Sequence, residues 1–406
     1  MSSIFAYFPD KEELLASYRP HKRLPFRKVN NHIHTPYSFS AFASVSEAVQ
    51  KAVEADVRIL GINDFYVCSG YEEFQQQCCD LGVFPLFNIE LIGVSTADQK
   101  AGIRINDPGN PGRIYVSGKG LAHPSILPAE SRQKLDRIVE ESNQQVGAMI
   151  GLLNAWLERK GLEFRFSFDE LMADLAEGLL RERHLAKAVR LKLEEVAASE
   201  EELFSLLELL YDGRPSACAR GDRIGLENEL RARLLKSAAP AYVPEDEKAF
   251  LPLPEIMSLI RKAGGEPAYP MLLDGTGAEM TDFEANMEGL MDSLSNLGFR
   301  LVECIPRRNQ AEVLQQYVTY FYEHGFVVSF GTEHNSSAME PLEVRSKGGA
   351  ALDKEMQEIS FRGAAWQAAY QYLFEKEGRS CLERDRDEME FIGRAVLQHY
   401  FYNCNC

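Results

Sequence analysis

Two histidines separated by one residue, His32 and His34, are the residues of this sequence best suited to metal chemistry. They follow the run Val29-Asn30-Asn31, and we expect this run to form a β-strand that ends at the two histidines. Residues i and i+2 of a strand point to the same face, so both imidazoles can converge on one ion at the strand end. Because the motif is short, the alternative is one packed, hydrogen-bonded histidine beside a solvated one.

The segments that would position these histidines alternate between short apolar runs and amphipathic helices, the order typical of βα units in a parallel sheet or barrel. A capping-box spacing, Ser44 to Glu47, predicts the start of the first of these helices. The predicted strands cover residues 29–34, 58–64, 84–90, 266–270, 299–305 and 326–330. Further helices are predicted over about 282–297, 310–324, 353–376 and 384–402.

The middle of the chain has a different composition, rich in Leu, Ala, Glu, Lys and Arg and poor in strand-like runs. Its periodicity predicts helices over about 130–160, 168–196 and 200–211. We therefore expect residues 1–124 and 251–406 to form an α/β barrel with C-terminal helices. Residues 125–250 are then a mostly helical insertion domain.

Polar or ionisable residues end the predicted strands, where a βα barrel forms its active site. They are His32, His34, Asp64, Glu90, Tyr269, Glu303, Glu333 and His334. Two imidazoles with two or more carboxylates suit Zn²⁺, Mn²⁺ or Fe²⁺ better than Ca²⁺ or Mg²⁺, which prefer oxygen ligands.

Composition excludes several other classes of protein. The 406 residues carry a formal net charge of −17 with basic and acidic residues mixed, which argues against a nucleic-acid surface. The eight cysteines include no CxxC pair, and Cys404 and Cys406 are expected to lie in a frayed, reduced tail. No segment reaches the ~20 apolar residues of a membrane span, and the N-terminus does not look like a signal peptide. A cytoplasmic protein without membrane contact is expected.

The order of these motifs resembles the PHP (polymerase and histidinol phosphatase) family. The resemblance rests on H-x-H at 32–34, Ile-Asn-Asp at 62–64, the strand ending in Glu90, and Gly-Thr-Glu-His at 331–334. Segments 182–189 and 241–270 are similar to the insertion and return strand of PHP phosphoesterases. The resemblance covers most of residues 29–337. It implies a distorted TIM-like (β/α)7 barrel, the fold of a family of metal-dependent phosphoesterases that usually hold two or three divalent ions.

Several ligand positions of the family carry other residues here. Phe39 stands where the family has an aspartate, and Phe65, Tyr115, Tyr269 and Asn335 stand where it has histidines. By the same resemblance, the four ligands of one ion are retained as His32, His34, Glu90 and Glu333. These substitutions predict a single divalent ion, Zn, Mn or Fe, in each chain.

Two residues beside these ligands are candidates for catalysis. Asp64 could be a general base; the alternative is a carboxylate that holds a ligand histidine in place. His334 could be an additional ligand or could orient the substrate.

Five residues are candidates for substrate binding, each with a structural alternative. Tyr115 and Tyr269 could hydrogen-bond the substrate or fill the core. Arg307 and Arg308 could hold a phosphate or carboxylate, or form a solvated pair. The family resemblance lets His184, on an insertion helix, face the pocket; a half-buried helix histidine is the alternative.

The sequence thus predicts a metal-dependent, phosphoesterase-like hydrolase of a small phosphorylated or anionic metabolite, acting through a metal-activated water. Phosphoester cleavage in this family depends on neighbouring ions that stabilise the attacking and leaving oxygens. One ion therefore also fits a single-metal isomerase, lyase or C–N hydrolase acting on a sugar-acid-like metabolite. A catalytically inactive, ligand-binding variant is the third possibility. The sequence does not specify the substrate or the oligomeric state.

Overall fold

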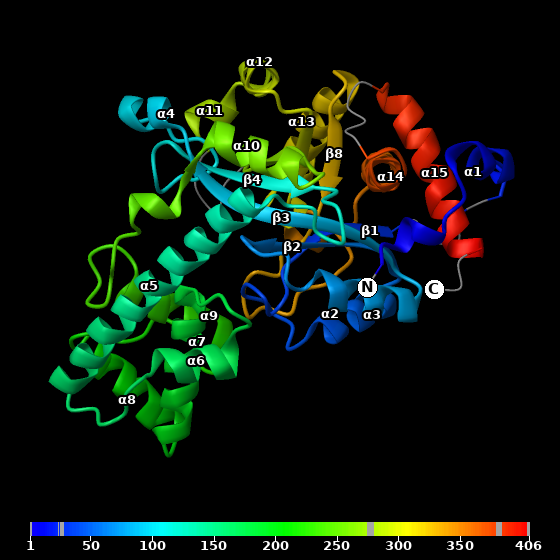
Figure 1. Cartoon of the computed structure of the whole chain (residues 1–406). Coiled ribbons are helices and arrows are strands. Elements are labelled where there is room, and N and C mark those ends of the chain that lie inside the picture. Colours follow the sequence, from blue (N-terminus) through cyan, green and yellow to red (C-terminus); the bar gives the residue numbers. More distant parts are fainter. Residues whose placement is uncertain (1, 23, 25–27, 274–279, 379–383, 404–406) are drawn as a thin grey trace.

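The computed structural model describes residues 2–22, 24, 28–273, 280–378 and 384–403. At its centre, an eight-stranded sheet curves into a nearly closed barrel (Figure 1). The strand order is β1-β2-β3-β4-β6-β7-β8, with the short strand β5 paired to β3. The strands are β1 (Lys28–Ile33), β2 (Val57–Phe65), β3 (Phe84–Val94), β4 (Arg113–Lys119), β5 (Leu251–Pro252), β6 (Glu266–Met271), β7 (Leu301–Cys304) and β8 (Val327–Phe330).

The barrel is distorted at β4, which runs antiparallel to both β3 and β6, while the other neighbouring strands are parallel. It closes through the segment after β8. The Glu333 amide donates to the His32 carbonyl at 2.9 Å, and the His34 amide donates to the Glu333 carbonyl at 2.7 Å. The expected α/β fold, a distorted TIM-like barrel, is confirmed.

Strand β1 has an irregular register that turns more of its side chains inward than simple alternation allows. The three-residue step from Asn30 to Ile33 lies opposite a two-residue step of β2. Such an extra residue re-aims the side chains that follow it. The neighbours Asn31 and His32 consequently both point into the barrel, where His32 Nδ1 lies 3.1 Å from a Glu303 carboxylate oxygen.

Helices cover the outside of the sheet, and one long helix closes one end of the barrel. The covering helices are α2 (Val45–Glu54), α3 (Tyr71–Leu81), α4 (Thr96–Ala101), α10 (Leu253–Lys262), α11 (Asp282–Ala285), α12 (Met287–Leu297) and α13 (Ala311–Glu323). Ser44 caps the start of α2 by accepting from the Glu47 amide, as its spacing predicted, but the Glu47 carboxylate accepts from the Ala43 amide, so the reciprocal bond of a capping box is not formed. Short turns are η1 (Ile4–Tyr7), η4 (Pro306–Arg308) and η5 (Lys347–Gly349).

Helix α14 (Lys354–Glu377) is buried along most of its length and packs with α15 (Arg386–Asn403), against which α1 (Lys11–Ser17) also packs. It forms a hydrophobic cluster with the first halves of the strands, including Val29, Phe84 and Val327. Gln367 of α14 also forms hydrogen bonds with Asn31 and Asn88, so α14 fills that end of the barrel.

The segment between β4 and β5 is helical, as expected, and has a hydrophobic cluster of its own. Its helices are α5 (Ala129–Arg159), α6 (Phe168–Leu175), α7 (Glu182–Val196), α8 (Glu200–Leu210) and α9 (Arg223–Leu230), with short turns η2 (Arg231–Leu235) and η3 (Glu247–Ala249). Figure 1 shows these helices extending from one side of the barrel. The proposed division at residues 125 and 250 stays a prediction.

The predicted strands are present, but two predicted helices are interrupted. The helix expected over 168–196 breaks between α6 and α7, where Gly178 has a φ of 101°. The helix expected over 282–297 breaks at Asn286, whose side chain caps α12. Cys404 and Cys406 lie outside the described residues.

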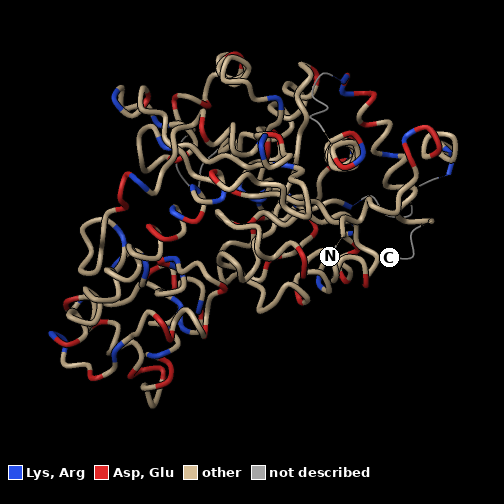
Figure 2. Tube along the Cα trace, viewed as in Figure 1, with Lys and Arg blue, Asp and Glu red and all other residues tan. Residues whose placement is uncertain are grey.

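Charged residues are interspersed along the chain, as Figure 2 shows. Among the described residues, no helix is long and apolar enough to cross a membrane. The absence of a nucleic-acid surface and the cytoplasmic location stay predictions.

Candidate metal centre

Three buried side chains converge inside the barrel: His32 of β1, His34 directly after β1, and Glu90 of β3. The Nε2 atoms of His32 and His34 lie 3.2 Å apart. Glu90 Oε2 lies 3.0 Å from His34 Nε2 and 3.6 Å from His32 Nε2. None of the three residues is more than 4% exposed. The predicted pair of histidines therefore does share one face with a carboxylate.

The other ring nitrogen of His32 is held by a buried carboxylate. His32 Nδ1 lies 3.1 Å from Glu303 Oε2, which also accepts a hydrogen bond of 2.6 Å from Ser117. The second Glu303 oxygen is bonded by the Nζ of Lys119, and both of these side chains are fully buried. A proton on Nδ1 bonded to Glu303 leaves the His32 Nε2 lone pair directed at the cluster.

The other ring nitrogen of His34 is held in the same way through a serine. His34 Nδ1 lies 3.0 Å from Ser38 Oγ, and that hydroxyl donates to Asp64 at 2.6 Å. Asp64 also accepts a 2.7 Å bond from the Thr35 amide. Both histidines thus have Nδ1 tied toward a carboxylate and Nε2 directed at Glu90.

This arrangement fits a divalent ion. Ligand atoms about 2.0–2.1 Å from a tetrahedral Zn²⁺ lie about 3.3 Å from one another, close to the three separations observed. Glu90 Oε2 is buried and has no hydrogen-bond partner in the described part of the chain. An ion would satisfy this oxygen.

Asn63 also lies beside His32. Its amide nitrogen is 2.9 Å from His32 Nε2, while its oxygen is buried and has no hydrogen-bond partner among the described residues. Rotating the amide by 180° would exchange the two atoms and bring the oxygen toward the three ligands.

The surroundings of the cluster carboxylates favour their ionised forms. Burial raises the pKa of Glu90, but the nearby His32 and His34 imidazoles and their charge lower it well below its ordinary value. Burial also raises the pKa of Glu303, and Lys119 and His32 together lower it to about 2. Burial lowers the pKa of His32, but Glu303 and Glu90 outweigh it and raise the value to about 9. A metal ion would displace that proton.

Glu333, the fourth expected ligand, is not brought to this cluster. Its backbone closes the barrel against β1, in a left-handed conformation with a φ of 64°. Its carboxylate pairs with Arg308 instead of facing Glu90. Metal binding by Glu333 would require this ion pair to open, and it stays a prediction.

His334 is not positioned as an acid, a base or a ligand. Its Nε2 bonds the Glu340 carbonyl at 2.9 Å, its Nδ1 bonds Thr332 at 2.7 Å, and its ring stacks on Phe42. Burial and the charge of Arg307 lower its pKa to about 3. The expected catalytic role finds no support, because both nitrogens are engaged in a neutral ring.

Asp64 lies behind His34, with three donors on its oxygens. The alternative considered for this residue, a carboxylate that holds a ligand histidine, agrees with this position; a general base does not.

Tyr269 faces away from the barrel interior. It pairs in register with Val302, one residue before Glu303, and alternation sends its ring to the outer side. There its hydroxyl donates to Glu284 at 2.9 Å and its ring packs near Phe299. Its expected substrate contact finds no support, and the phenol is part of the core.

Tyr115 lies on the wall of the site and is partly exposed. Its ring centroid is 6.4 Å from that of Phe65, and the Phe65 ring lies 4.9 Å from that of His34. Burial and the charges of Asp107 and Glu90 raise the Tyr115 pKa, so the phenol keeps its proton and can donate it in a hydrogen bond.

The expected anion-binding pair is already neutralised, since Arg307 pairs with Glu340 and Arg308 with Glu333. His184 is buried against the Phe39 ring at 4.7 Å, and its Nδ1 accepts the Arg181 amide. Burial lowers the His184 pKa to about 3. It connects the insertion to the barrel as a neutral ring.

Three residues of the site were given no role from the sequence: Asn63, Ser117 and Lys119. Glu303 was named among the residues at strand ends, but no role was assigned to it. Lys119 had no detectable signal, because a lysine in a strand is ordinarily a surface residue.

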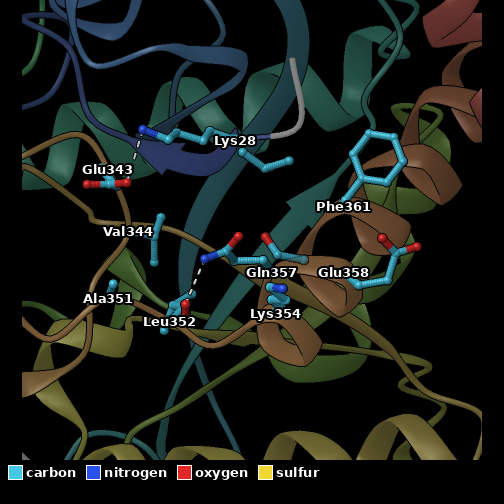
Figure 3. Close-up of a pocket in the computed structure, with 11 residues that line it drawn as sticks. Lys28, Glu343, Val344, Ala351, Leu352, Lys354, Gln357, Glu358 and Phe361 are labelled. Atoms are coloured by element: carbon cyan, nitrogen blue, oxygen red, sulfur yellow. Dashed lines mark hydrogen bonds and ion pairs between the residues drawn. The ribbon is translucent and has the colours of Figure 1, made fainter. Parts of the chain in front are cut away.

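A separate cavity of about 350 Å³ lies at the opposite end of β1, between α14 and residues 343–352 (Figure 3). Two interactions are drawn there: Lys28 pairs with Glu343 at 3.1 Å, and Gln357 donates to the Leu352 carbonyl at 2.7 Å. This cavity contains no part of the candidate metal centre.

Comparison with known proteins agrees with this architecture. Residues 30–183 match the PHP domain family. No curated protein sequence matches the chain. A candidate metal-dependent phosphoesterase from Bifidobacterium adolescentis has 17% identity and a TM-score of 0.51, over 83% of this chain and 96% of that one. An amidohydrolase from Chromobacterium violaceum, with bound sulfate and no metal, has 15% identity and a TM-score of 0.50, over 82% and 96%. At these identities the likeness is one of fold.

Proposed function

This chain carries a PHP domain, and on that premise we propose that it is a metal-dependent hydrolase of small phosphorylated or otherwise anionic metabolites. One divalent ion, Zn²⁺, Mn²⁺ or Fe²⁺, would be held by His32, His34 and Glu90. The observation that carries the proposal is the buried, unpartnered Glu90 oxygen facing two Nε2 atoms whose rings are fixed through Nδ1.

The ion would supply a Lewis acid that lowers the pKa of water near it. The protein supplies the rest. Glu303 and Asp64 fix the orientation of the two imidazoles, and Lys119 balances the charge of Glu303. The Tyr115 phenol, protonated and partly exposed, is available to donate a hydrogen bond to the substrate.

Two features support a single ion. Within the described ranges, His32, His34 and Glu90 are the one group of His, Cys, Asp or Glu residues whose ligand atoms converge in this way. Phe65 packs against His34, and Phe39 packs against His184, so apolar rings stand at two positions where the family has ligands.

Metal analysis tests the site directly. Purified protein is expected to contain about one equivalent of Zn, Mn or Fe, measured by elemental mass spectrometry. His32→Ala and Glu90→Ala should each reduce this to background, since two ligands remain. His324→Ala, at an exposed histidine directly after α13 (Ala311–Glu323), is the matched control and should leave the content unchanged. Two or more equivalents would contradict the single-ion proposal, and none would favour a ligand-binding protein.

An activity screen then separates the reactions. Release of phosphate from sugar phosphates and nucleotides is measured with Mn²⁺ added, beside a panel of sugar acids and amides. We expect phosphate release that His32→Ala abolishes. If every phosphoester is inert while a sugar acid or an amide is converted, the single-metal isomerase, lyase or C–N hydrolase replaces the phosphoesterase.

A further inference from the structure

We propose that helix α14 and the end of strand β4 position the metal-binding imidazole of His32 through a buried chain of hydrogen bonds; this rests on the proposed function. In order, the chain joins Gln367 of α14, Asn31, Lys119 and Glu303, which holds the His32 ring. Gln367, Asn31 and Lys119 are then positioning residues, which act on the ion through the side chain that binds it.

Glu303 is the link that contacts the ring. Its Oε2 lies 3.1 Å from His32 Nδ1 and accepts a bond of 2.6 Å from Ser117, and its Oε1 is bonded by the Nζ of Lys119. Glu303 and Lys119 are both 0% exposed. A carboxylate with donors on both oxygens is held in one orientation, and it holds the imidazole in one orientation in turn.

Strand β4 supplies both of these donors from one face. Ser117 and Lys119 are two residues apart, so alternation directs both side chains into the barrel. Tyr115, two residues earlier, shares this face and lies on the wall of the site. Ile114 and Val116 point the other way, into the hydrophobic core outside the sheet. One face of β4 therefore connects the wall of the site with the buried lysine behind it.

Lys119 also binds the backbone of β1. Its Nζ donates to the Asn31 carbonyl at 3.1 Å, and Asn88 of β3 donates to the same oxygen at 3.1 Å. Asn31 directly precedes His32, so these bonds fix the strand one residue before the ligand. The lysine thus contacts both the carboxylate that holds the ring and the backbone that carries it.

The side chain of Asn31 stabilises the irregular register of β1. In a regular strand Asn31 and His32 would point to opposite faces, but here both point inward. Asn31 Nδ2 donates to Gln367 at 2.7 Å and to Ser329 at 2.8 Å, and its Oδ1 accepts from Asn88 at 3.0 Å. Because an unbonded buried amide is costly, these partners favour the register that directs His32 at the cluster.

Gly61 of β2 leaves the space that these amides occupy. A Cβ added at Gly61 would lie 2.4 Å from Asn31 Oδ1 and 2.6 Å from Asn88 Nδ2. Gln367 bonds both amides, since it also donates to Asn88 Oδ1 at 2.5 Å. A layer of amides in the barrel interior thus joins α14 to the strand that carries the ligand.

The ion pair between Lys119 and Glu303 is not needed for stability. Replacing a fully buried ion pair with apolar residues of similar volume is often neutral or stabilising. Apolar side chains could therefore fill this part of the barrel equally well. They could not hold the Nδ1 proton of His32, and this contact gives the pair a role at the metal centre.

Zn²⁺ affinity and the visible spectrum of bound Co²⁺ test the chain of bonds. The metal-free full chain is titrated with Zn²⁺ against a chromogenic chelator, and Co²⁺ is then bound in place of Zn²⁺. We expect E303Q and K119M to raise the Kd for Zn²⁺ by roughly 10–100-fold and to change the Co²⁺ spectrum, because the imidazole loses its fixed orientation.

A double variant tests whether Lys119 acts through Glu303. K119M/E303Q should bind Zn²⁺ no more weakly than E303Q does, because the lysine has no effect once its carboxylate partner is gone. This variant removes both buried charges together, so it also provides the measurement if K119M alone does not fold.

Gln367→Leu tests the far end of the chain of bonds. It keeps the approximate size of the side chain and removes the bonds to Asn31 and Asn88, so the Kd for Zn²⁺ should rise by roughly 3–10-fold. Gln75→Leu is the matched control, since this buried glutamine of α3 donates to the Ser2 carbonyl at 2.9 Å. It should lower the free energy of unfolding and leave the Kd and the Co²⁺ spectrum unchanged.

The outcomes separate this inference from the proposed function. If the unmodified protein binds no ion, the proposed function fails and the inference fails with it. If it binds an ion that H32A loses, while E303Q, K119M/E303Q and Q367L keep its Kd and Co²⁺ spectrum, the inference alone is overturned. An equal rise of the Kd in Q75L and Q367L would overturn it as well, because metal affinity would then follow general stability. Circular dichroism confirms that each variant is folded.

Discussion

The two histidines of the candidate metal centre are distinguished from ordinary buried histidines by what holds their outer nitrogens. His32 is tied to Glu303 directly, and His34 is tied to Asp64 through Ser38. Partners of this kind set the tautomer and raise the basicity of a metal-binding imidazole. The carboxylates behind the ligands are thus as informative as the ligands themselves.

Cutting the link behind His34 should weaken metal binding without removing a ligand. We expect Ser38→Ala and Asp64→Asn to raise the Kd for Zn²⁺ by roughly 10–100-fold, because the imidazole loses its anchor and its charge support. Competition with a chromogenic chelator measures the change. Ser46→Ala, on the surface of α2, is the control. Unchanged affinity in both variants would show that the Asp64 contact plays no part in metal binding.

Glu284 gives a pH-dependent prediction away from the site. It is fully buried, accepts bonds from Tyr269 and the Leu272 amide, and its pKa is raised from 4.5 to about 7, chiefly by burial. The folded state therefore holds this proton more tightly than the unfolded state does. Its contribution to stability is full below about pH 4.5 and is lost as the pH rises toward 7.

The size of this effect follows from the shift, which corresponds to about 3 kcal/mol. Glu284→Gln keeps an acceptor for both bonds and cannot ionise. Urea unfolding between pH 5 and pH 8 should show a smaller fall in the free energy of unfolding for this variant than for the unmodified protein. Parallel curves for the two proteins would mean that Glu284 ionises normally in the folded state.

At the scale of elements, the site depends on two local irregularities and one close contact. The extra residue in β1 turns both Asn31 and His32 inward, and the break between α6 and α7 creates the helix start that carries Arg181. Helix α14 fills the other end of the barrel, approaching β8 at Gly363.

Glycines at these helix contacts should not tolerate a methyl group. An added Cβ would lie 1.9 Å from the Val328 carbonyl oxygen at Gly363, and 1.7 Å from the Ala365 carbonyl oxygen at Gly393. We expect Gly363→Ala and Gly393→Ala to lower the free energy of unfolding by about 1–3 kcal/mol, because the backbones must separate.

Gly151→Ala is the matched control, since this helical glycine of α5 is exposed with nothing within 4 Å of the added atom. It should raise the free energy of unfolding by about 0.5–1 kcal/mol through helix propensity. Guanidinium unfolding compares the three variants. If Gly151→Ala lowers the free energy of unfolding as much as the other two substitutions do, the close contacts of Gly363 and Gly393 do not explain their loss of stability.

At the scale of the whole molecule, the barrel carries the candidate metal ligands, and the insertion contacts the barrel beside them. The two parts meet where Arg181 covers Phe65 and His184 packs on Phe39.

Removing the insertion should leave metal binding intact. Gln145 donates to the Val243 carbonyl at 2.8 Å, so the chain leaves and returns at neighbouring points. We expect a chain with residues 146–242 replaced by a short Gly-Ser linker to fold and to bind about one metal ion. Thermal unfolding and metal analysis measure this. A shortened chain that binds no metal and does not unfold cooperatively would show that the insertion is part of the barrel's core.

The sequence by itself determined the barrel, the helical insertion and the core of the metal site. Alternation and strand ends are local properties that can be read from the sequence. His32, His34 and Glu90 lie at the ends of two predicted strands, β1 and β3, which are separated in the sheet by β2 alone. Asp64 was found by the same rule, together with the alternative role that its position supports.

Only the tertiary structure decided which polar groups face the candidate metal centre. Tyr269 points outward because its register places it beside Val302 and not beside Glu303, and neighbouring residues of a strand point to opposite faces. Glu333 points toward Arg308 because the two side chains form an ion pair. Lys119 became part of the interior through a partner, Glu303, 184 residues away in the chain. Such contacts join side chains that no local pattern connects, so they exist only after the barrel has closed.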